Sequence, residues 1–142
     1  MFTYEQTTGK LYTPTGTLLG TGYAGRGEGK NNPVWEAVKD YGPLPVGMWT
    51  LIKLWKDHPV VGEYAIELQP DASTRVKILS YGRDPVGFFC HGENPAHVGE
   101  SSDGCIILWR TARLDWWENG DRQLHVISGL PISPPTSYPR SL

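Results

Sequence analysis

Short runs of β-forming residues, each closed by turn chemistry, dominate this sequence and limit what it can fold into. Seventeen glycines and twelve prolines make up about a fifth of its 142 residues, below the ~25–30% typical of low-complexity chains. They interrupt the chain too often for long helices, while the intervening segments are rich in aromatic and β-branched residues. The sequence therefore predicts a mostly-β fold, a sandwich or partial barrel with one or two short helices.

The turns also place the individual elements. A hairpin is expected around Thr8-Gly9, because both flanking runs favour strands. Strands are predicted at residues 2–7, 10–13, 17–19, 48–55, 63–68, 75–80, 86–91, 105–108 and 124–127. Helices are predicted at residues 33–41, after an Asn32-Pro33 start signal, and at 111–119, before Gly120. The five glycines between residues 20 and 29 indicate a tight surface loop, since they match no phosphate-binding motif.

The length indicates one domain, because domains cluster near ~100–150 residues. We assign residues 1–130 to a folded domain and residues 131–142, which contain four prolines in nine positions, to an extended tail. No internal repeat divides the chain.

Charge and hydrophobicity exclude several kinds of partner. Thirteen basic and fifteen acidic residues give a formal charge of −2, and the pI is about 6.1, so nucleic acid is not an expected ligand. No segment approaches the ~20 apolar residues of a membrane span. The first residues lack a basic and then apolar leader, and we therefore expect synthesis in the cytoplasm without a signal peptide.

The strongest chemical signal is a histidine followed by a cysteine. An apolar run ends at His91, and the turn Ser101-Ser102-Asp103-Gly104 delivers Cys105 at the start of another apolar run. A nucleophilic cysteine needs a base to form its thiolate, and a histidine within hydrogen-bond reach is the usual one. Such a histidine is often oriented by a backbone carbonyl. Gly104 lets an acyl carbonyl approach closely, and free N–H groups of this turn would form an oxyanion hole.

Other interpretations of these residues remain open. A single cysteine at the start of an apolar strand is usually a buried hydrophobic residue. A zinc site would need Cys90, His91, His97 and Cys105, but neighbouring residues of one strand point to opposite faces. The same alternation makes Cys90 a packed bystander. His58 and His125 are most simply structural or solvated. We expect no metal and no other cofactor.

The pattern His91-Gly92 followed by Ser102-x-Gly104-Cys105-Ile106 resembles the catalytic signature of L,D-transpeptidases, which remodel peptidoglycan with a cysteine nucleophile and an upstream histidine base. An ordered series of further motifs is similar to one branch of that family, the toxic effectors delivered by bacterial type VI secretion. These motifs are Gly22-Tyr23-Ala24-Gly25, Asn31-Asn32-Pro33, Gly42-Pro43-x-Pro45-x-Gly47 and Gly82-Arg83. The resemblance spans about residues 1–128.

Two positions depart from the housekeeping members of that family. They usually carry histidine where this chain has Asp103, and arginine where it has Ile107. The loss of the arginine leaves any substrate contact that it makes in the wider family without a counterpart here. The effector branch tolerates both changes.

The resemblance implies an L,D-transpeptidase-like fold and cysteine acyl transfer on peptidoglycan tetrapeptide stems, at the bond between diaminopimelate and D-alanine. It implies Cys105 as nucleophile, His91 as base, and Ser102 and Gly104 as residues of the supporting turn. Arg83 is a candidate for pairing a substrate carboxylate, with a structural role equally open, and Tyr23 is a candidate for lining the cleft.

The outcome of the reaction and the setting of the protein follow from the same resemblance. Transfer to water would be L,D-carboxypeptidase activity, and transfer to another D-amino acid would be exchange. The implied partners are a cognate immunity protein and a component of the secretion apparatus, with delivery to the periplasm of a target bacterium. The alternatives are a non-catalytic peptidoglycan-binding module and a resident cell-wall L,D-transpeptidase.

Overall fold

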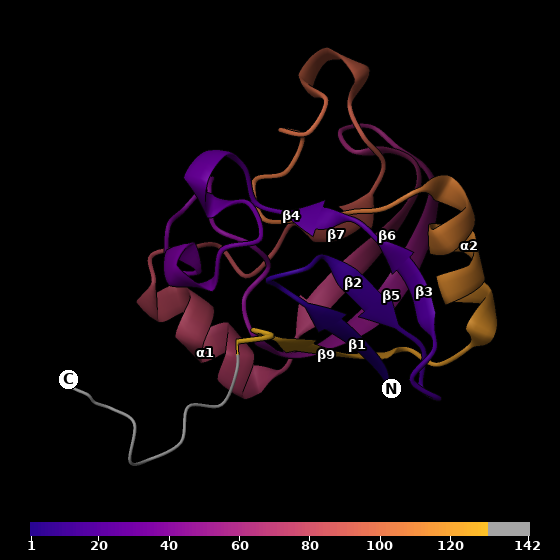
Figure 1. The fold of residues 1–142 in the computed structure, drawn as a ribbon, viewed down its shortest axis with the longest axis horizontal. Coiled ribbons are helices and arrows are strands. Elements are labelled where there is room, and N and C mark those ends of the chain that lie inside the picture. Colours follow the sequence, from indigo (N-terminus) through magenta and orange to yellow (C-terminus); the bar gives the residue numbers. More distant parts are fainter. Residues whose placement is uncertain (131–142) are drawn as a thin grey trace.

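The computed structural model describes residues 1–130 and confirms the mostly-β class. Its strands are β1 (Phe2–Glu5), β2 (Lys10–Tyr12), β3 (Leu18–Thr21), β4 (Tyr23–Ala24), β5 (Gly47–His58), β6 (Gly62–Pro70), β7 (Phe88–His91), β8 (Ile106–Ile107) and β9 (Gln123–Ile127). The helices are α1 (Ala72–Ser80) and α2 (Arg110–Asn119), with short 3₁₀ turns at η1 (Gly27–Gly29), η2 (Pro33–Trp35) and η3 (Pro95–His97) (Figure 1). Neither described helix has the length and apolar character needed to cross a bilayer. The predicted tail, 131–142, lies outside the described residues.

The strands of residues 1–130 form one curled sheet. Their order is β3-β2-β1-β9-β5-β6-β7-β8-β4. The two edge strands, β3 and β4, are consecutive in the sequence with a single residue between them. The sheet must therefore bend until its edges meet, and the result is the nearly closed, barrel-like sheet seen in Figure 1. The expected partial barrel is confirmed.

Gly22 makes this closure possible. Its N–H donates to the carbonyl of Gly9 at 2.8 Å, which ties it to the β1–β2 turn. On the other side, a Cβ built on Gly22 would lie 1.7 Å from the carbonyl oxygen of Ile107 in β8. A side chain at position 22 would push β8 away from the edge strands β3 and β4, so only glycine fits there.

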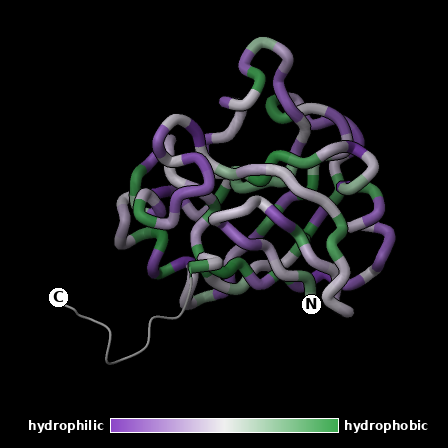
Figure 2. Tube along the Cα trace, viewed as in Figure 1, coloured by the Kyte–Doolittle hydropathy of each residue, from purple (hydrophilic) through white to green (hydrophobic). Residues whose placement is uncertain are grey.

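The barrel interior is filled with large apolar side chains. Trp49, Trp116, Tyr4 and Phe2 are almost completely buried. The rings of Phe2 and Trp116 lie 5.7 Å apart, and those of Trp49 and Phe88 lie 5.3 Å apart, separations at which aromatic pairs attract each other. Figure 2 shows hydrophobic segments on the central strands and hydrophilic residues over many of the outer loops. Trp116 belongs to α2, so this helix packs against the core and closes one side of it.

The strand predicted at 75–80 is wrong, because these residues form most of α1. Pro70 ends β6, and the side chain of Asp71 then accepts a hydrogen bond from the N–H of Thr74. An aspartate in this position caps a helix and stabilises its first turn. Thr74 and Ile78 form the buried side of the helix, whereas Val76 between them is exposed. In a strand all three residues would share one face.

The helix predicted at 33–41 is also wrong beyond its first turn. Asn32 caps η2 as expected, with its side chain accepting from the N–H of Val34. After Trp35 the chain continues in turns rather than an α-helix, and Asp40 has a left-handed φ of 69°. A non-glycine residue with positive φ ends helical propagation. The predicted helix at 111–119 is confirmed as α2, with Gly120 in the left-handed conformation after it.

Several predicted strands shift at their ends, and one segment is more regular than predicted. Gly20 lies inside β3, and the adjacent β4 was predicted as loop, so the glycine-rich surface loop is confirmed only from Gly25 onward. The hairpin of β1 and β2 is confirmed, with antiparallel pairing. β5 extends to His58, three residues past its predicted end.

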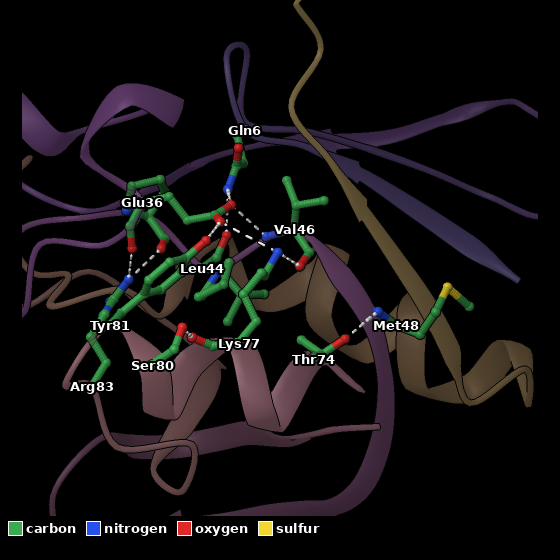
Figure 3. A network of polar contacts seen from close by, with 12 residues as sticks. Gln6, Glu36, Leu44, Val46, Met48, Thr74, Lys77, Ser80, Tyr81 and Arg83 are labelled. Atoms are coloured by element: carbon green, nitrogen blue, oxygen red, sulfur yellow. Dashed lines mark hydrogen bonds and ion pairs between the residues drawn. The ribbon is translucent and has the colours of Figure 1, made fainter. Parts of the chain in front are cut away.

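Glu36 connects the loop of residues 33–46 to the rest of the domain (Figure 3). Its carboxylate accepts hydrogen bonds from Gln6, from the N–H of Val46 and from the hydroxyl of Tyr81, and its oxygen lies 3.3 Å from the ammonium of Lys77. Burial alone raises the pKa of Glu36, but these four partners outweigh it and lower the pKa below its usual value. The ionised carboxylate thereby fixes this loop against α1.

Candidate active site

The register of β7 and β8 places Cys105 and His91 on neighbouring strands. The two strands run parallel, with Cys90 opposite Ile106 and His91 opposite Ile107. Cys105, one residue before β8, is therefore level with Phe89. Side chains alternate between the faces of a sheet, so His91 shares the face of Phe89 and Cys105. Cys105 and His91 are diagonal neighbours on one face, a relation in which larger side chains can meet.

Cys90 faces the opposite side, as predicted. It is completely buried and belongs to the main core with Phe88 and Ile106. Cys105 instead packs with Phe89 and Ala65 in a second, smaller cluster. Both cysteines are free thiols. The alternation in residues 88–91 therefore separates a cysteine of the interior from a cysteine of the outer face.

The Cys105 sulfur is enclosed by backbone groups. Its Sγ accepts a hydrogen bond from the N–H of Phe89 at 3.3 Å and lies 3.7 Å from the carbonyl oxygen of Gly87, to which the thiol donates. Burial raises the pKa of the Cys105 thiol to about 11; the Phe89 N–H opposes this shift. At neutral pH the free protein holds Cys105 as a thiol, so its sulfur becomes a strong nucleophile only if a base takes the proton.

His91 has the orientation of such a base. Its Nδ1 lies 2.8 Å from the carbonyl oxygen of Gly92. Because a carbonyl can only accept, Nδ1 carries the proton and Nε2 has the free lone pair. Burial lowers the pKa of His91, and the nearby charge of Arg113 lowers it further, so the imidazole is neutral at pH 7. Within residues 1–130, the His91 ring makes no hydrogen bond with Cys105. The Cys105 thiol instead donates to the carbonyl of Gly87.

Ser102 holds the turn that carries the cysteine. Its side chain is fully buried, donates to the carbonyl of Cys105, and accepts from the N–H of Gly104 at 3.0 Å and the N–H of Gly25 at 2.8 Å. These contacts confirm the predicted hydrogen bonding beside Cys105. They also show a connection that sequence spacing does not reveal, since Gly25 lies 77 residues away.

Gly104 has a different role from the one predicted for it. Its N–H donates to Ser102 Oγ and is therefore not free to bind an oxyanion. Its φ is 136°, and a Cβ at this position would lie 2.5 Å from Arg83 Nη2 and 2.7 Å from Phe88 Cε1. Glycine is needed here because the backbone conformation and the contacts leave no room for a side chain.

Arg83 connects three segments around the cysteine turn. The residue is 4% exposed, and its guanidinium donates to the carbonyls of Glu36, Gly42, Pro43 and Asp103. These contacts give it a structural role. It also lines a pocket of about 130 Å³ together with Gly87, whose carbonyl contacts Cys105. Pairing of Arg83 with a substrate carboxylate stays a prediction.

Tyr23 lies in the same row of the sheet as His91. It pairs with Ile107, which pairs with His91 on its other side. It lines an open pocket of about 200 Å³. Its hydroxyl donates to Glu93 and accepts from the N–H of Ser101. The expectation that Tyr23 lines a cleft agrees with this position, while contact with a substrate is untested.

Arg113 was missed by the sequence analysis. The residue is 4% exposed, and its guanidinium donates to the backbone carbonyls of Glu63, Tyr64 and Leu108. A Cβ on Gly92 would lie 3.0 Å from its Nη1, so Arg113 lies directly behind the residue that orients His91. An arginine in a short amphipathic helix gives no local signal of this role, because its acceptors lie up to 50 residues away.

The remaining histidines lie outside this pair. His97 is exposed in η3, in the loop between β7 and β8, as predicted for a bystander. His58 ends β5 rather than lying in a loop. Its Nδ1 accepts from the N–H groups of Val60 and Val61, and its ring lies 4.8 Å from that of Phe89. His58 therefore helps to build an apolar wall next to Cys105.

Comparison with protein-family models, with curated proteins and with solved structures finds no match to this chain. The function must therefore be argued from the site. Within the described residues, a buried thiol and a neutral imidazole with a free Nε2 lie on the same face of the sheet, and residues near each of them line a pocket. A nucleophile and its base require residues of these two types on one face.

Proposed function

We propose that this protein is an L,D-transpeptidase-like cysteine acyltransferase that acts on peptidoglycan tetrapeptide stems. One observation carries the proposal: Cys105 and His91 share a face of adjacent parallel strands, and His91 Nδ1 is bound to the Gly92 carbonyl. The ordered motifs that resemble the effector branch support it, because they meet around the cysteine turn. Gly25 contacts Ser102, and Arg83 connects Gly42 and Pro43 to Asp103.

The first half of the reaction forms a thioester. His91 Nε2 takes the proton of the Cys105 thiol as Sγ attacks the carbonyl of the third stem residue. The resulting tetrahedral intermediate collapses when the C–N bond to D-alanine breaks, and the imidazolium gives its proton to the leaving amine. Because burial keeps both His91 and Cys105 uncharged before the substrate arrives, proton transfer accompanies attack rather than preceding it.

The second half releases the acyl group. His91 removes a proton from water or from an amine as it attacks the thioester, the C–S bond breaks, and the thiolate recovers a proton from the imidazolium. Water yields a tripeptide stem, and a D-amino acid yields an exchanged stem. Either product removes tetrapeptides from the pool that normal cross-linking uses.

We further propose that the protein acts in the periplasm of a target bacterium, after delivery by a type VI apparatus, and that a cognate immunity protein neutralises it. The substrate lies outside the inner membrane, so the site of action follows from the chemistry. An immunity protein that fills the pockets beside Cys105 and His91 would block both halves of the reaction.

Mass spectrometry of muropeptides tests the chemistry directly. Purified protein incubated with tetrapeptide muropeptides should convert them to tripeptides, or to exchanged stems when a D-amino acid is added. Cys105→Ala should abolish both products, whereas Cys90→Ala serves as the matched control and should retain them. Binding of muropeptides without turnover would instead identify a peptidoglycan-binding module.

Expression in two compartments tests the setting. Fused to a periplasmic signal peptide, the protein should deplete tetrapeptides and arrest or swell the cells, whereas expression in the cytoplasm should be nearly harmless. Toxicity in the cytoplasm, or toxicity in the periplasm that persists in Cys105→Ala, would contradict the cell-wall mechanism.

A further inference from the structure

An open pocket lies beyond His91 as seen from Cys105, at the carboxyl ends of β7 and β8. Its volume is about 200 Å³, and it is lined by Thr21, Gly22, Tyr23, Glu93, Ile107, Leu108 and Trp109. Pockets for drug-sized ligands measure about 300–1,000 Å³, so this one suits a single amino acid better than a second stem peptide. Ile107, which lines it, is the strand partner of His91, so the pocket lies beside the base that must activate an acceptor.

The pocket carries negative charge. Partial burial alone raises the pKa of Glu93, but hydrogen bonds from Ser101 and Tyr23 outweigh it, and the net pKa lies below its usual value. The carboxylate is therefore ionised at neutral pH. The ammonium of Lys30 lies over the Tyr23 ring, 4.7 Å from its centroid, and 3.8 Å from Glu100. Glu93 is the one charged side chain among the described residues that line the pocket, so its carboxylate sets the sign of the charge there.

The other walls suit the aliphatic and cationic parts of a long side chain. Trp109 is 74% exposed, although a tryptophan normally buries most of its ring. The face of an indole is the strongest of the side-chain surfaces for binding a cation. Ile107 and Leu108 are almost completely buried, so the exposed Trp109 ring is the main apolar wall of the pocket. The methylene groups of a lysine-like chain can lie against it while the charge stays near water.

We propose that this pocket binds the cationic side chain of a basic D-amino acid, such as D-lysine, whose α-amine is the acceptor in the exchange reaction. The inference rests on the function proposed above. Glu93 pairs with the side-chain cation, and Trp109 stacks on it. The α-amine cannot itself be the partner of Glu93, because it must be uncharged to attack.

The chemical step balances without any further reactant. The neutral α-amine attacks the thioester carbonyl, the new C–N bond forms, and the C–S bond to Cys105 breaks. His91 takes one proton from the amine and returns it to the sulfur. The products are an exchanged stem peptide and the free thiol, so the protein ends in the state in which it began.

Competition between matched acceptors tests the proposal. Tetrapeptide muropeptides are incubated with the protein and equal concentrations of D-lysine and D-norleucine, which have similar chain lengths but differ in charge. Mass spectrometry gives the ratio of the two exchanged stems. Wild-type protein should favour D-lysine roughly fivefold to tenfold, the combined size of an exposed ion pair and a cation–π contact. Glu93→Gln, which can still accept from Tyr23, should lower the ratio to about twofold to threefold, because only the cation–π contact with Trp109 remains.

A control variant and a second measurement complete the test. Glu100→Gln removes an equal charge from the same loop without lining the pocket, and it should leave the ratio unchanged. In Cys105→Ala, which cannot turn over, D-lysine should shift the indole N–H resonance of Trp109 more than D-norleucine does.

The possible outcomes separate this inference from the proposed function. Exchange with no preference for D-lysine, or a preference that is undiminished in Glu93→Gln, overturns the inference while leaving the acyl transfer intact. Release of D-alanine with no exchange product also overturns it, because water is then the acceptor. Failure to release D-alanine at all overturns the proposed function itself.

Discussion

The two cysteines of this chain lie on adjacent strands but in different surroundings. Cys90 faces the barrel interior, completely buried among the aromatic residues of the main core. Cys105 faces the outer side, where it packs in a small cluster with Phe89 and Ala65 and is 8% exposed. Their sequence contexts are both apolar, so the face of the sheet, and not local hydrophobicity, separates them.

Burial raises the pKa of both thiols, and burial alone therefore does not identify a nucleophile. The raised pKa of Cys90 is opposed only by the charge of Arg113. Cys105 also has a backbone N–H directed at its sulfur and the guanidinium of Arg83 nearby, and both favour its thiolate. A reactive cysteine is distinguished by the groups that stabilise its charged form and by access for a substrate.

Replacement of each cysteine by alanine gives the largest expected difference. Cys105→Ala should lower the rate of D-alanine release by about 10⁴-fold or more, the order of magnitude for loss of a nucleophile. Cys90→Ala should change the rate by less than about threefold, while lowering stability by about 1 kcal/mol through the small cavity it leaves. Equal losses in the two variants, measured by mass spectrometry of muropeptides, would remove the distinction between the two faces.

The histidines give the next largest difference. His91→Ala should lower the rate by about 10²–10⁴-fold, the range for a general acid and base. His97→Ala changes an exposed residue of the loop between β7 and β8 and should have little effect. The same muropeptide assay measures both. A larger loss in the His97 variant would show that the base is not the residue on the face of Cys105.

The pH dependence of thiol labelling sharpens the comparison. Because the pKa of Cys105 is about 11 in the free protein, its thiolate fraction should rise about tenfold per pH unit from pH 7 to pH 9. The iodoacetamide labelling rate, followed by peptide mass spectrometry, should rise equally, with Cys105 modified before Cys90. A rate that is constant over this range would instead indicate a thiolate–imidazolium pair formed before the substrate binds.

Replacing Glu36 should have a smaller effect, on the stability of the whole domain rather than on the reactivity of either cysteine. The pKa of Glu36 is lowered in the folded protein. Ionisation of Glu36 therefore stabilises the fold at pH values above the pKa of the unfolded chain, and this stabilisation is lost as the pH falls through the pKa of the folded protein. Glu36→Gln should lower the free energy of unfolding at pH 7 by about 1–3 kcal/mol, and the difference from wild type should shrink below about pH 4. Denaturant unfolding at several pH values measures this.

The Glu36 variant also tests whether the two regions are independent. The labelling order of Cys105 and Cys90 should be unchanged under native conditions, because neither thiol contacts Glu36. Reversal of that order in folded protein would show that the loop of residues 33–46 controls access to the cysteines.

Much of the candidate site could be predicted because it depends on local pattern. Alternation along residues 88–91 placed Cys90 and His91 on opposite faces, and the run of small polar residues before Cys105 predicted its turn. The hydrogen bonds of Ser102 agree with that prediction, but the engaged N–H of Gly104 does not. Whether a turn N–H is free depends on side chains that fold back onto it, and sequence spacing does not specify these.

The sequence by itself determined the features that depend on near neighbours: the β1–β2 hairpin, the end of α2 at Gly120, and the strand that carries His91. These follow from backbone sterics and side-chain alternation over a few residues. Tertiary structure decided the rest. It made residues 75–80 a helix, closed the barrel at Gly22, and directed two buried arginines onto distant carbonyls. It also assembled the pocket around Glu93 and Trp109. Each of these depends on contacts between segments tens of residues apart, and such contacts exist only after the chain has folded.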